Sequence, residues 1–237
     1  MGECRLSTPA ILKILLLETC HLNPHYSDIT YGSSNPIVRA YFWSRLRSMA
    51  KMVQRTSVAV ILDIGCGEGQ LLKLIADEQT GSPCIGIDIN RDIYLAKEEA
   101  KLEHYQNVHF LRADCTHLPL RPECSQLAFC ASVLEHLHNV QAALHEVSGV
   151  LAPGGKLVAG IPTENWAYRL GRKVARLRKP VDHYYSAEYL EAMLKREFTQ
   201  HRVLKLPFSL VPRRLSLYVI TVCVKNSRLE KSGGHDV

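Results

Sequence analysis

The sequence predicts an α/β fold in which a doubly wound, mostly parallel sheet of seven strands has helices on both faces. Strand-like apolar runs alternate with helical segments from about residue 58 to residue 161, which is typical of a parallel sheet covered on both sides by helices. The first of these runs ends in a glycine-rich turn that opens a helix. The last two runs have no helix between them, which predicts an antiparallel C-terminal hairpin.

The composition is that of an ordinary globular chain. Its 237 residues suffice for one domain with a sizeable core, and 46% of them are hydrophobic against 22% charged. The net charge of +6 mildly favours acidic partners such as phosphates, anionic lipid or nucleic acid. The eight cysteines form no C-x-x-C pair, so they predict neither a zinc site nor a disulfide framework and favour a reducing compartment.

Residues 1–55 are expected to form an N-terminal helical cap segment. Asn35 and Pro36 suit the N-cap and the first position of a helix over 36–54. The apolar residues of this helix recur at helical spacing. Four cations are expected largely on its other faces: Arg39, Arg45, Arg47 and Lys51.

Residues 56–226 are expected to form the main domain. Its first five strands are predicted over 58–64, 83–89, 108–113, 126–133 and 156–161, with helices over 70–78, 92–105 and 139–151. A helix over 186–197 with Ser186 as its N-cap precedes two final strands, over 199–206 and 215–224. The polar tail 227–237 is expected to be disordered.

The glycine-rich turn is the strongest functional signal. Asp63 closes the first strand, and Gly65, Gly67 and Gly69 follow at alternate positions before the helix. Such glycines let a ligand approach the backbone closely, and the helix end offers unpaired N–H groups. The spacing is G-x-G-x-G, whereas a dinucleotide turn reads G-x-G-x-x-G. A tight turn without a ligand is the alternative interpretation.

Two further carboxylates close the next strands. Asp88 ends the second strand and Asp114 the third, and ligands of doubly wound sheets bind beyond the carboxyl ends of the strands. A carboxylate at Asp88 can accept hydrogen bonds from two ribose hydroxyls. Asp88 could also cap the helix that follows it, and Asp114 could be a simple turn residue.

Together with the segments 132–138 and 151–157, these features resemble the class I S-adenosylmethionine (SAM) methyltransferases. The resemblance implies a Rossmann-like fold and SAM as the cofactor, with S-adenosylhomocysteine as the product. Asp63 and the turn would then border the methionine portion, Asp88 the ribose, and Asp114 with Cys115 the adenine. The expected cofactor-binding residues are Arg39, Asp63, Gly65, Cys66, Gly67, Gly69, Asp88, Ile89, Asp114, Cys115 and Ser132.

Within this family the sequence most resembles the ubiquinone-biosynthesis O-methyltransferases. Its segment Asn35-Pro36-Ile37-Val38-Arg39 is similar to their N-P-L-R segment with one additional residue. The resemblance suggests that Arg39 pairs with the carboxylate of SAM, a geometry that suits a guanidinium. A solvated helix arginine is the alternative.

The expected reaction is methyl transfer to a small-molecule or lipid-linked acceptor, at a hydroxyl oxygen. The N-P-P-Y segment of adenine- and glutamine-modifying methyltransferases is absent, which disfavours nucleic acid. His136 and His183 are the candidate catalytic bases, since a neutral imidazole can take the hydroxyl proton. A purely structural role for either histidine, an RNA or protein methyltransferase, and a SAM-binding protein without catalysis remain alternatives. No metal site is predicted, because Glu135 and His136 alone do not make one.

Residues 162–186 are expected to form a basic insertion on the substrate side. Within 166–179 its apolar residues recur at near-helical spacing among six cations: Arg169, Arg172, Lys173, Arg176, Arg178 and Lys179. Such a helix can lie on an anionic membrane surface or bind a phosphorylated ligand. A solvated helix that packs on the core and an RNA-binding helix are the alternatives. The apolar run 11–17 is too short to span a bilayer, so we expect a cytoplasmic protein with peripheral membrane contact at most.

Overall fold

The computed structural model describes residues 30–52, 60–78, 81–175, 183–207 and 212–226. The predicted disordered tail and most of the predicted cap segment lie outside these ranges. So do Arg176, Arg178 and Lys179 of the predicted basic helix.

Seven strands form one sheet in the order β3-β2-β1-β4-β5-β7-β6. The strands are β1 (Ile61–Ile64), β2 (Cys84–Asp88), β3 (Val108–Arg112), β4 (Ser125–Ala131), β5 (Leu151–Pro162), β6 (Phe198–Leu206) and β7 (Tyr218–Lys225). The first five pair in parallel, and β7 lies antiparallel between β5 and β6. The predicted sheet, with its antiparallel C-terminal hairpin, is confirmed.

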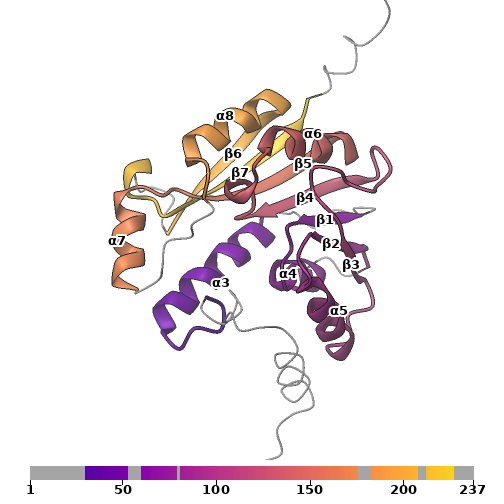
Figure 1. Ribbon diagram of the computed structural model, residues 1–237, viewed down its shortest axis with the longest axis horizontal. Coiled ribbons are helices and arrows are strands. Elements are labelled where there is room, and N and C mark those ends of the chain that lie inside the picture. The colour runs from indigo at the N-terminus through magenta and orange to yellow at the C-terminus, as the bar shows by residue number, and fades with distance from the viewer. Residues whose placement is uncertain (1–29, 53–59, 79–80, 176–182, 208–211, 227–237) are drawn as a thin grey trace, which may run out of the picture.

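Helices cover both faces of this sheet. They are α3 (Pro36–Ala50), α4 (Gln70–Glu78), α5 (Ile93–Leu102), α6 (Val140–Val150), α7 (Trp166–Val174) and α8 (Ala187–Glu197), with short 3-10 helices η1 (Leu134–His136) and η2 (Arg213–Leu215). Figure 1 shows α6 and α8 above the sheet and α3, α4 and α5 below it. The sheet therefore separates two apolar layers.

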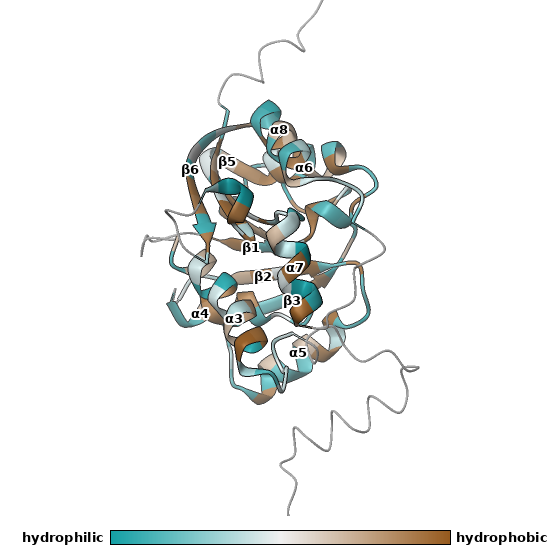
Figure 2. Cartoon of the chain, turned by 90° about the vertical axis from the view of Figure 1, so that its left-hand side faces the viewer, coloured by the Kyte–Doolittle hydropathy of each residue, from teal (hydrophilic) through white to brown (hydrophobic). Residues whose placement is uncertain are grey.

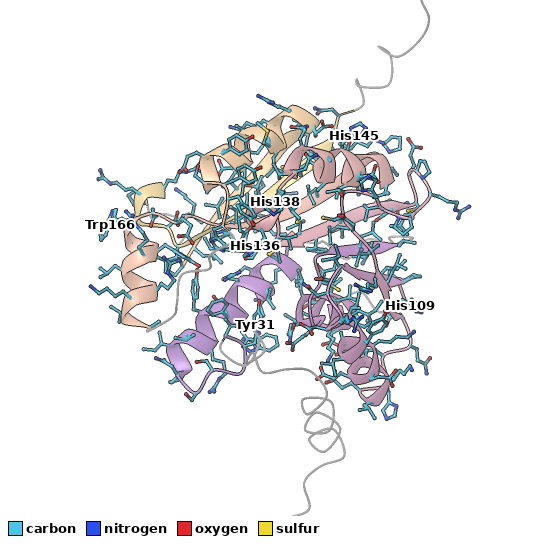
Figure 3. The ribbon with its side chains drawn as sticks, viewed as in Figure 1. Tyr31, His109, His136, His138, His145 and Trp166 are labelled. Carbon is cyan, nitrogen blue, oxygen red and sulfur yellow. The ribbon has the colours of Figure 1, made fainter. Side chains whose placement is uncertain are left out.

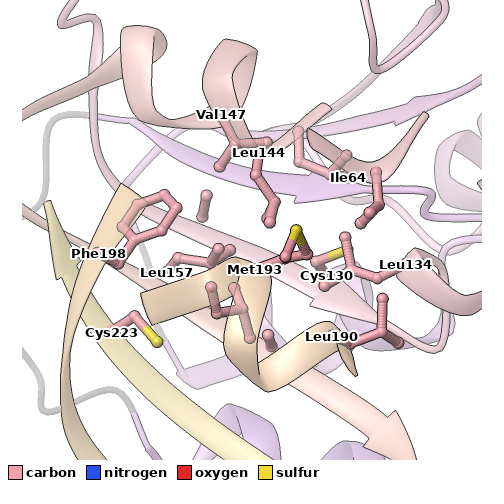
Figure 4. Packing of buried hydrophobic residues seen from close by; sticks show 14 of the residues in the cluster. Ile64, Cys130, Leu134, Leu144, Val147, Leu157, Leu190, Met193, Phe198 and Cys223 are labelled. Carbon is pink, nitrogen blue, oxygen red and sulfur yellow. The ribbon is translucent and has the colours of Figure 1, made fainter. Parts of the chain in front are cut away.

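Both layers are built by strands that are buried on their two faces. One cluster joins β1, β4 and β5 to α6 and α8 through residues such as Leu144, Leu157 and Leu190 (Figure 4). The other joins the opposite face of the strands to α3 and α4. In Figure 2 the central strand β1 is mostly brown, whereas the outer strands β3 and β6 and the helices also carry teal residues. Continuous apolar strands are what a parallel sheet between two helix layers requires.

The predicted helix caps are confirmed. The side chain of Asn35 accepts hydrogen bonds from the N–H groups of Ile37 and Val38, and that of Ser186 accepts one from Tyr189. These acceptors satisfy N–H groups that have no partner within the helix. The α3 helix ends at Ala50, which is earlier than the predicted residue 54.

The start of β5 differs from the prediction. The strand was predicted over 156–161, but β5 begins at Leu151, so the residues Pro153-Gly154-Gly155 lie within it. The ladder with β4 is irregular here, because Ser125 pairs with Leu151 and Leu127 pairs with Lys156. The strand therefore begins directly after α6 and absorbs Pro153-Gly154-Gly155 as a bulge.

The predicted basic helix is present as α7, at the edge of the fold beside η2 (Figure 1). None of its residues is buried. Among the described helices, none combines the length and the apolar character that crossing a membrane requires.

Candidate functional site

The glycine turn is tied to the neighbouring strand by its backbone. The N–H groups of Gly65 and Cys66 both donate to the carbonyl oxygen of Ile87, at 2.7 and 3.1 Å. A Cβ atom on Gly65 would collide with the side chain of Val133, whereas one on Gly67 would meet no atom within 4 Å. Gly65 is thus required for packing. Gly67, at φ +52°, leaves its backbone open to a ligand.

Asp63 lies directly beneath this turn and is almost fully buried, with 1% of its surface exposed. Its Oδ2 atom has no hydrogen-bond partner. Burial, with a smaller contribution from the negative charge of Asp88, raises the pKa of its carboxyl to about 8. SAM carries two cationic groups, a sulfonium and an ammonium. A cation bound at the turn would compensate the negative charge of the buried, unpartnered Asp63 carboxylate. The residues at the turn therefore fit the predicted cofactor.

Asp88 connects the turn to the loop after β2. Its Oδ2 accepts a hydrogen bond from the N–H of Gly67, and its Oδ1 accepts one from the N–H of Asn90, both at 2.8 Å. Asp88 therefore closes a turn with Asn90 and does not cap α5, whose N-cap is Asp92, so the capping alternative is wrong. Each carboxylate oxygen has two lone pairs, so contact with ribose hydroxyls remains compatible with these bonds.

The ends of β2 and β3 lie side by side, since the N–H of Ala113 donates to the carbonyl oxygen of Asp88. Asp114 is exposed, and hydrogen bonds from the N–H and hydroxyl of Thr116 lower the pKa of its carboxyl. Cys115 is half-buried and Ile89 is exposed. The structure thus brings the carboxylates predicted for the cofactor to adjacent strand ends.

Arg39 and Arg45 lie in different surroundings on α3. Arg39 is exposed and donates to the carbonyl oxygen of Ser33 at 3.0 Å. Arg45 is 2% exposed; it donates to the hydroxyl of Ser132, and its guanidinium carbon lies 4.0 Å from the ring centroid of Tyr218. The expectation that Arg45 lies off the buried face is wrong. The Ser132 hydroxyl and the aromatic rings compensate its loss of water.

Arg45 is a residue of the site that sequence reasoning missed. A signal was present, because Val38, Phe42, Arg45 and Met49 are spaced as one helix face and all four are buried. Ser132, predicted for the cofactor, follows β4 at φ +56° and also shares a hydrogen bond of 2.9 Å with the hydroxyl of Tyr218. The charge of Arg45 is thus held at the ends of the central strands.

The two candidate bases come together from different parts of the chain. The rings of His136, in η1, and His183, before α8, lie edge to face with centroids 4.6 Å apart. Figure 3 labels His136 and His138 near the middle of the molecule. The N–H of Tyr184 donates to the carbonyl oxygen of Glu135 at 2.9 Å, which ties the two segments to each other.

Glu135 lies between these imidazoles and the core. It is 1% exposed, and neither of its carboxylate oxygens has a hydrogen-bond partner. Burial raises the pKa of this carboxyl to about 7, against the opposing charges of His183 and Arg45. Its proton is therefore lost or gained near neutral pH.

The trio of Glu135, His136 and His183 also contains residue types that bind metal ions. One ligand atom of each lies within 4.8 Å of the other two. No metal site is predicted from the sequence. The EDTA control described under the proposed function tests that prediction. Cys130 of β4 is 2% exposed, and burial raises the pKa of its thiol well above the usual value.

Two residues near His183 were not singled out as site residues from the sequence. Glu164 follows β5, and its Oε1 lies 3.0 Å from Nδ1 of His183. Arg172 of α7 donates to both carboxylate oxygens of Glu164, at 3.2 and 3.3 Å. The position of Glu164 after the carboxyl end of a parallel strand was the available signal. Asp182, the neighbour of His183 in sequence, lies outside the described residues.

We expect Asp63→Asn to change how stability depends on pH. The folded protein holds the Asp63 proton with a pKa of about 8 against an ordinary value of 3.8. The stability that this proton contributes is complete below the ordinary pKa and is lost as the pH rises towards 8, by at most about 1.4 kcal/mol per pH unit. Asparagine does not ionise, so the variant gains stability relative to the wild type as the pH rises.

Urea unfolding between about pH 5 and pH 8 measures this difference in the free energy of unfolding. Glu78→Gln, at an exposed position of α4, is the control. A difference between Asp63→Asn and the wild type that does not vary with pH would contradict the burial of an ionisable Asp63.

Comparison with known sequences agrees with this geometry. Residues 62–159 match a family model described as a methyltransferase domain. The ubiquinone/menaquinone biosynthesis C-methyltransferase UbiE of Syntrophotalea carbinolica is 32% identical over 98 residues, which are 41% of this chain and 41% of that protein. The chain thus spans less than half the length of the first curated relatives it matches.

Solved structures share the fold. The PH0226 protein of Pyrococcus horikoshii superimposes with a TM-score of 0.67 at 19% identity, over 85% of this chain and 96% of that one. The N-methyltransferase NodS of Bradyrhizobium japonicum, in complex with S-adenosyl-l-homocysteine, gives a TM-score of 0.60 at 20% identity, over 90% and 97%. Residues 62–159 are therefore similar to a methyltransferase domain, and the chain shares the fold of these solved structures.

Proposed function

We propose that this protein transfers a methyl group from SAM to a hydroxyl oxygen of a small-molecule or lipid-linked acceptor and releases S-adenosylhomocysteine. The observation that carries the proposal is the arrangement along one edge of the sheet. The ends of β1 and β2 hold the open glycine turn and two carboxylates, and the segments after β4 and β5 hold two imidazoles.

The cofactor-binding roles follow the order of the strands. Asp63 and the turn of Gly65, Cys66, Gly67 and Gly69 would hold the methionine portion. Asp88 and Ile89 would hold the ribose, and Asp114 and Cys115 the adenine. Ser132 closes the set after β4, and Arg39 would contact the SAM carboxylate. When bound, SAM supplies an activated methyl group.

The residues of the chain then have to orient the acceptor, exclude water and take one proton. In an in-line transfer the bond from sulfur to methyl breaks as the bond from oxygen to methyl forms. The sulfonium becomes a neutral thioether, and the hydroxyl proton passes to a nitrogen of His183 or His136. Both imidazoles lie at the ends of the central strands, where such a substrate would be held.

The names of the relatives bear on the acceptor. UbiE is named for the biosynthesis of quinones, which supports an aromatic or lipid-linked acceptor. It is named a C-methyltransferase, so a carbon of the same kind of ring is the competing position. An RNA or protein acceptor, and SAM binding without catalysis, are the other possible outcomes of the tests.

The proposal also includes the domain boundaries of the chain. Residues 56–226 would be the methyltransferase domain, with 162–186 as the substrate-side insertion. The helix α3, from the cap segment 1–55, packs in the same apolar cluster as α4 and brings Arg45 to the site. It would therefore be a wall of the site and not an independent unit.

We expect Gly67→Ala to weaken SAM binding by at least about tenfold, because a side chain would occupy the open space above the turn. Gly154→Ala is a matched control: Gly154 also has a positive φ, +75°, and a Cβ on it would also meet no atom within 4 Å. Both variants carry similar backbone strain, but Gly154 lies in β5, away from the turn. Titration calorimetry with SAM measures the affinity. Equal losses in the two variants would contradict the assigned cofactor position.

We expect His183→Ala to lower methyl transfer by roughly 10²- to 10⁴-fold with SAM affinity unchanged, as loss of a general base does. His136→Ala is tested beside it. Deuterium-methyl SAM, with cell extract or dihydroxybenzoate as a hydroxyl probe, allows mass spectrometry to identify the product and the atom methylated. Full turnover in both variants would exclude an imidazole base, and loss of turnover with EDTA would indicate a metal ion instead.

We also propose that α7 contacts an anionic lipid surface. Trp166, Leu170 and Val174 lie one above another along the helix and are 54%, 53% and 76% exposed. Arg169 and Lys173 are exposed on the same helix. Apolar side chains flanked by cations suit insertion at the level of lipid headgroups.

In vesicle flotation with anionic lipid we expect Leu170→Asp to bind several-fold less than the wild type. Val203→Asp, at another exposed apolar position on β6, is the control. Absence of wild-type binding at low salt would remove the membrane contact and leave a freely diffusing acceptor.

A further inference from the structure

Glu164 is held in an unusual place and conformation. It follows β5 at φ +48°, a left-handed conformation that residues other than glycine seldom adopt. Its side chain is only 17% exposed. A conformation of this kind persists where surrounding contacts fix it, and here the contacts are His183 and Arg172.

The hydrogen bond to His183 defines which nitrogen of the ring carries a proton. Burial alone would raise the pKa of Glu164, but the hydrogen bond with His183 and the charge of Arg172 outweigh it and leave the pKa below its ordinary value. An ionised carboxylate can only accept, so Nδ1 of His183 must donate. The other nitrogen, Nε2, then keeps its lone pair and can accept a proton.

We propose that His183 is the base of the proposed methyl transfer and that Glu164, anchored by Arg172, is the residue that positions it. This inference rests on the proposed function and selects between its two histidines. Glu164 fixes the tautomer and the ring plane of His183 and stabilises the imidazolium that forms when the acceptor proton arrives. The proton moves from the acceptor oxygen to Nε2, and Glu164 itself is not protonated.

The other charged groups around His183 do not replace Glu164. His136 packs edge to face against the ring, and Glu135 of the same short helix has its pKa raised to about 7 by burial. Arg45, from α3, acts on Glu135. Arg172, from α7, contacts Glu164. Glu164 is the carboxylate that is hydrogen-bonded to the His183 ring.

Arg172 differs from the exposed cations beside it on α7. Its side chain is 12% exposed, and its guanidinium carbon lies 5.5 Å from the ring centroid of Tyr168 while Nη1 contacts both oxygens of Glu164. Lys173, the next residue, is exposed. The helix that we propose to contact lipid is therefore also the helix that anchors the positioning residue.

The test uses Glu164→Gln, which keeps the shape and an acceptor oxygen but removes the charge. Long-range proton–nitrogen NMR of the nitrogen-15-labelled protein, with His183→Ala for assignment and EDTA present, reports the tautomer of His183. In the wild type we expect Nδ1 to be protonated. In Glu164→Gln we expect a mixture of tautomers, because an uncharged amide oxygen holds the Nδ1 proton less strongly than a carboxylate does.

Turnover of dihydroxybenzoate gives the second readout. We expect the kcat of Glu164→Gln to fall roughly 10- to 100-fold and the acidic limb of its pH profile to move to lower pH, with unchanged SAM affinity. Arg172→Gln is expected to change the tautomer ratio in the same direction by a smaller amount. Arg196→Gln removes the same charge from an exposed position of α8 without touching Glu164, and should behave as the wild type.

An unchanged tautomer of His183 in Glu164→Gln would overturn the inference, as would equal effects of Arg172→Gln and Arg196→Gln. The NMR result does not depend on an acceptor. A coupled Glu164–His183 pair in a protein without methyl transfer would therefore count against the proposed function alone, and active protein with an uncoupled pair would count against this inference alone.

Discussion

The hydrogen bonds between the glycine turn and the end of β2 are the constraint on which the rest of the site depends. The carbonyl oxygen of Ile87 receives two N–H groups of the turn, and the carboxylate of Asp88 receives a third, from Gly67. These bonds tie the backbone of the turn to the end of β2 and fix its position relative to the two carboxylates. The backbone and carboxylate groups that a nucleoside ligand could contact at the ends of β1, β2 and β3 are positioned by these hydrogen bonds.

This arrangement costs stability where the side chains are buried without partners. Asp63 and Glu135 are both 1% exposed and have carboxylate oxygens without hydrogen-bond partners, and burial raises the pKa of each. A well-packed apolar residue at either position would favour folding. The two carboxylates lie in the two halves of the candidate site, one near the glycine turn and one near the imidazoles.

The imidazole side of the site is assembled from more distant parts of the chain. His136 comes from the segment after β4, Glu164 from the end of β5, Arg172 from α7 and His183 from the residues before α8. Parallel strands end at the same edge of a sheet, so loops that are far apart in sequence meet there. The ion pair of Arg172 with Glu164 connects the surface helix α7 to this cluster.

The sequence by itself determined the architecture. Apolar runs of strand length, glycines at alternate positions and capping residues such as Asn35 and Ser186 act through local sterics and hydrogen bonds, and these are readable from neighbours in the chain. The seven strands, the hairpin and the carboxylates at the ends of β1 to β3 were predicted for that reason. Only the tertiary structure decided the burial of Arg45, the bulge in β5 and the partner of His183. Each depends on residues that are distant in sequence and adjacent in space: the charge of Arg45 is tolerated because Ser132 and Tyr218 meet it, and Glu164 reaches His183 because the chain returns to the same edge of the sheet.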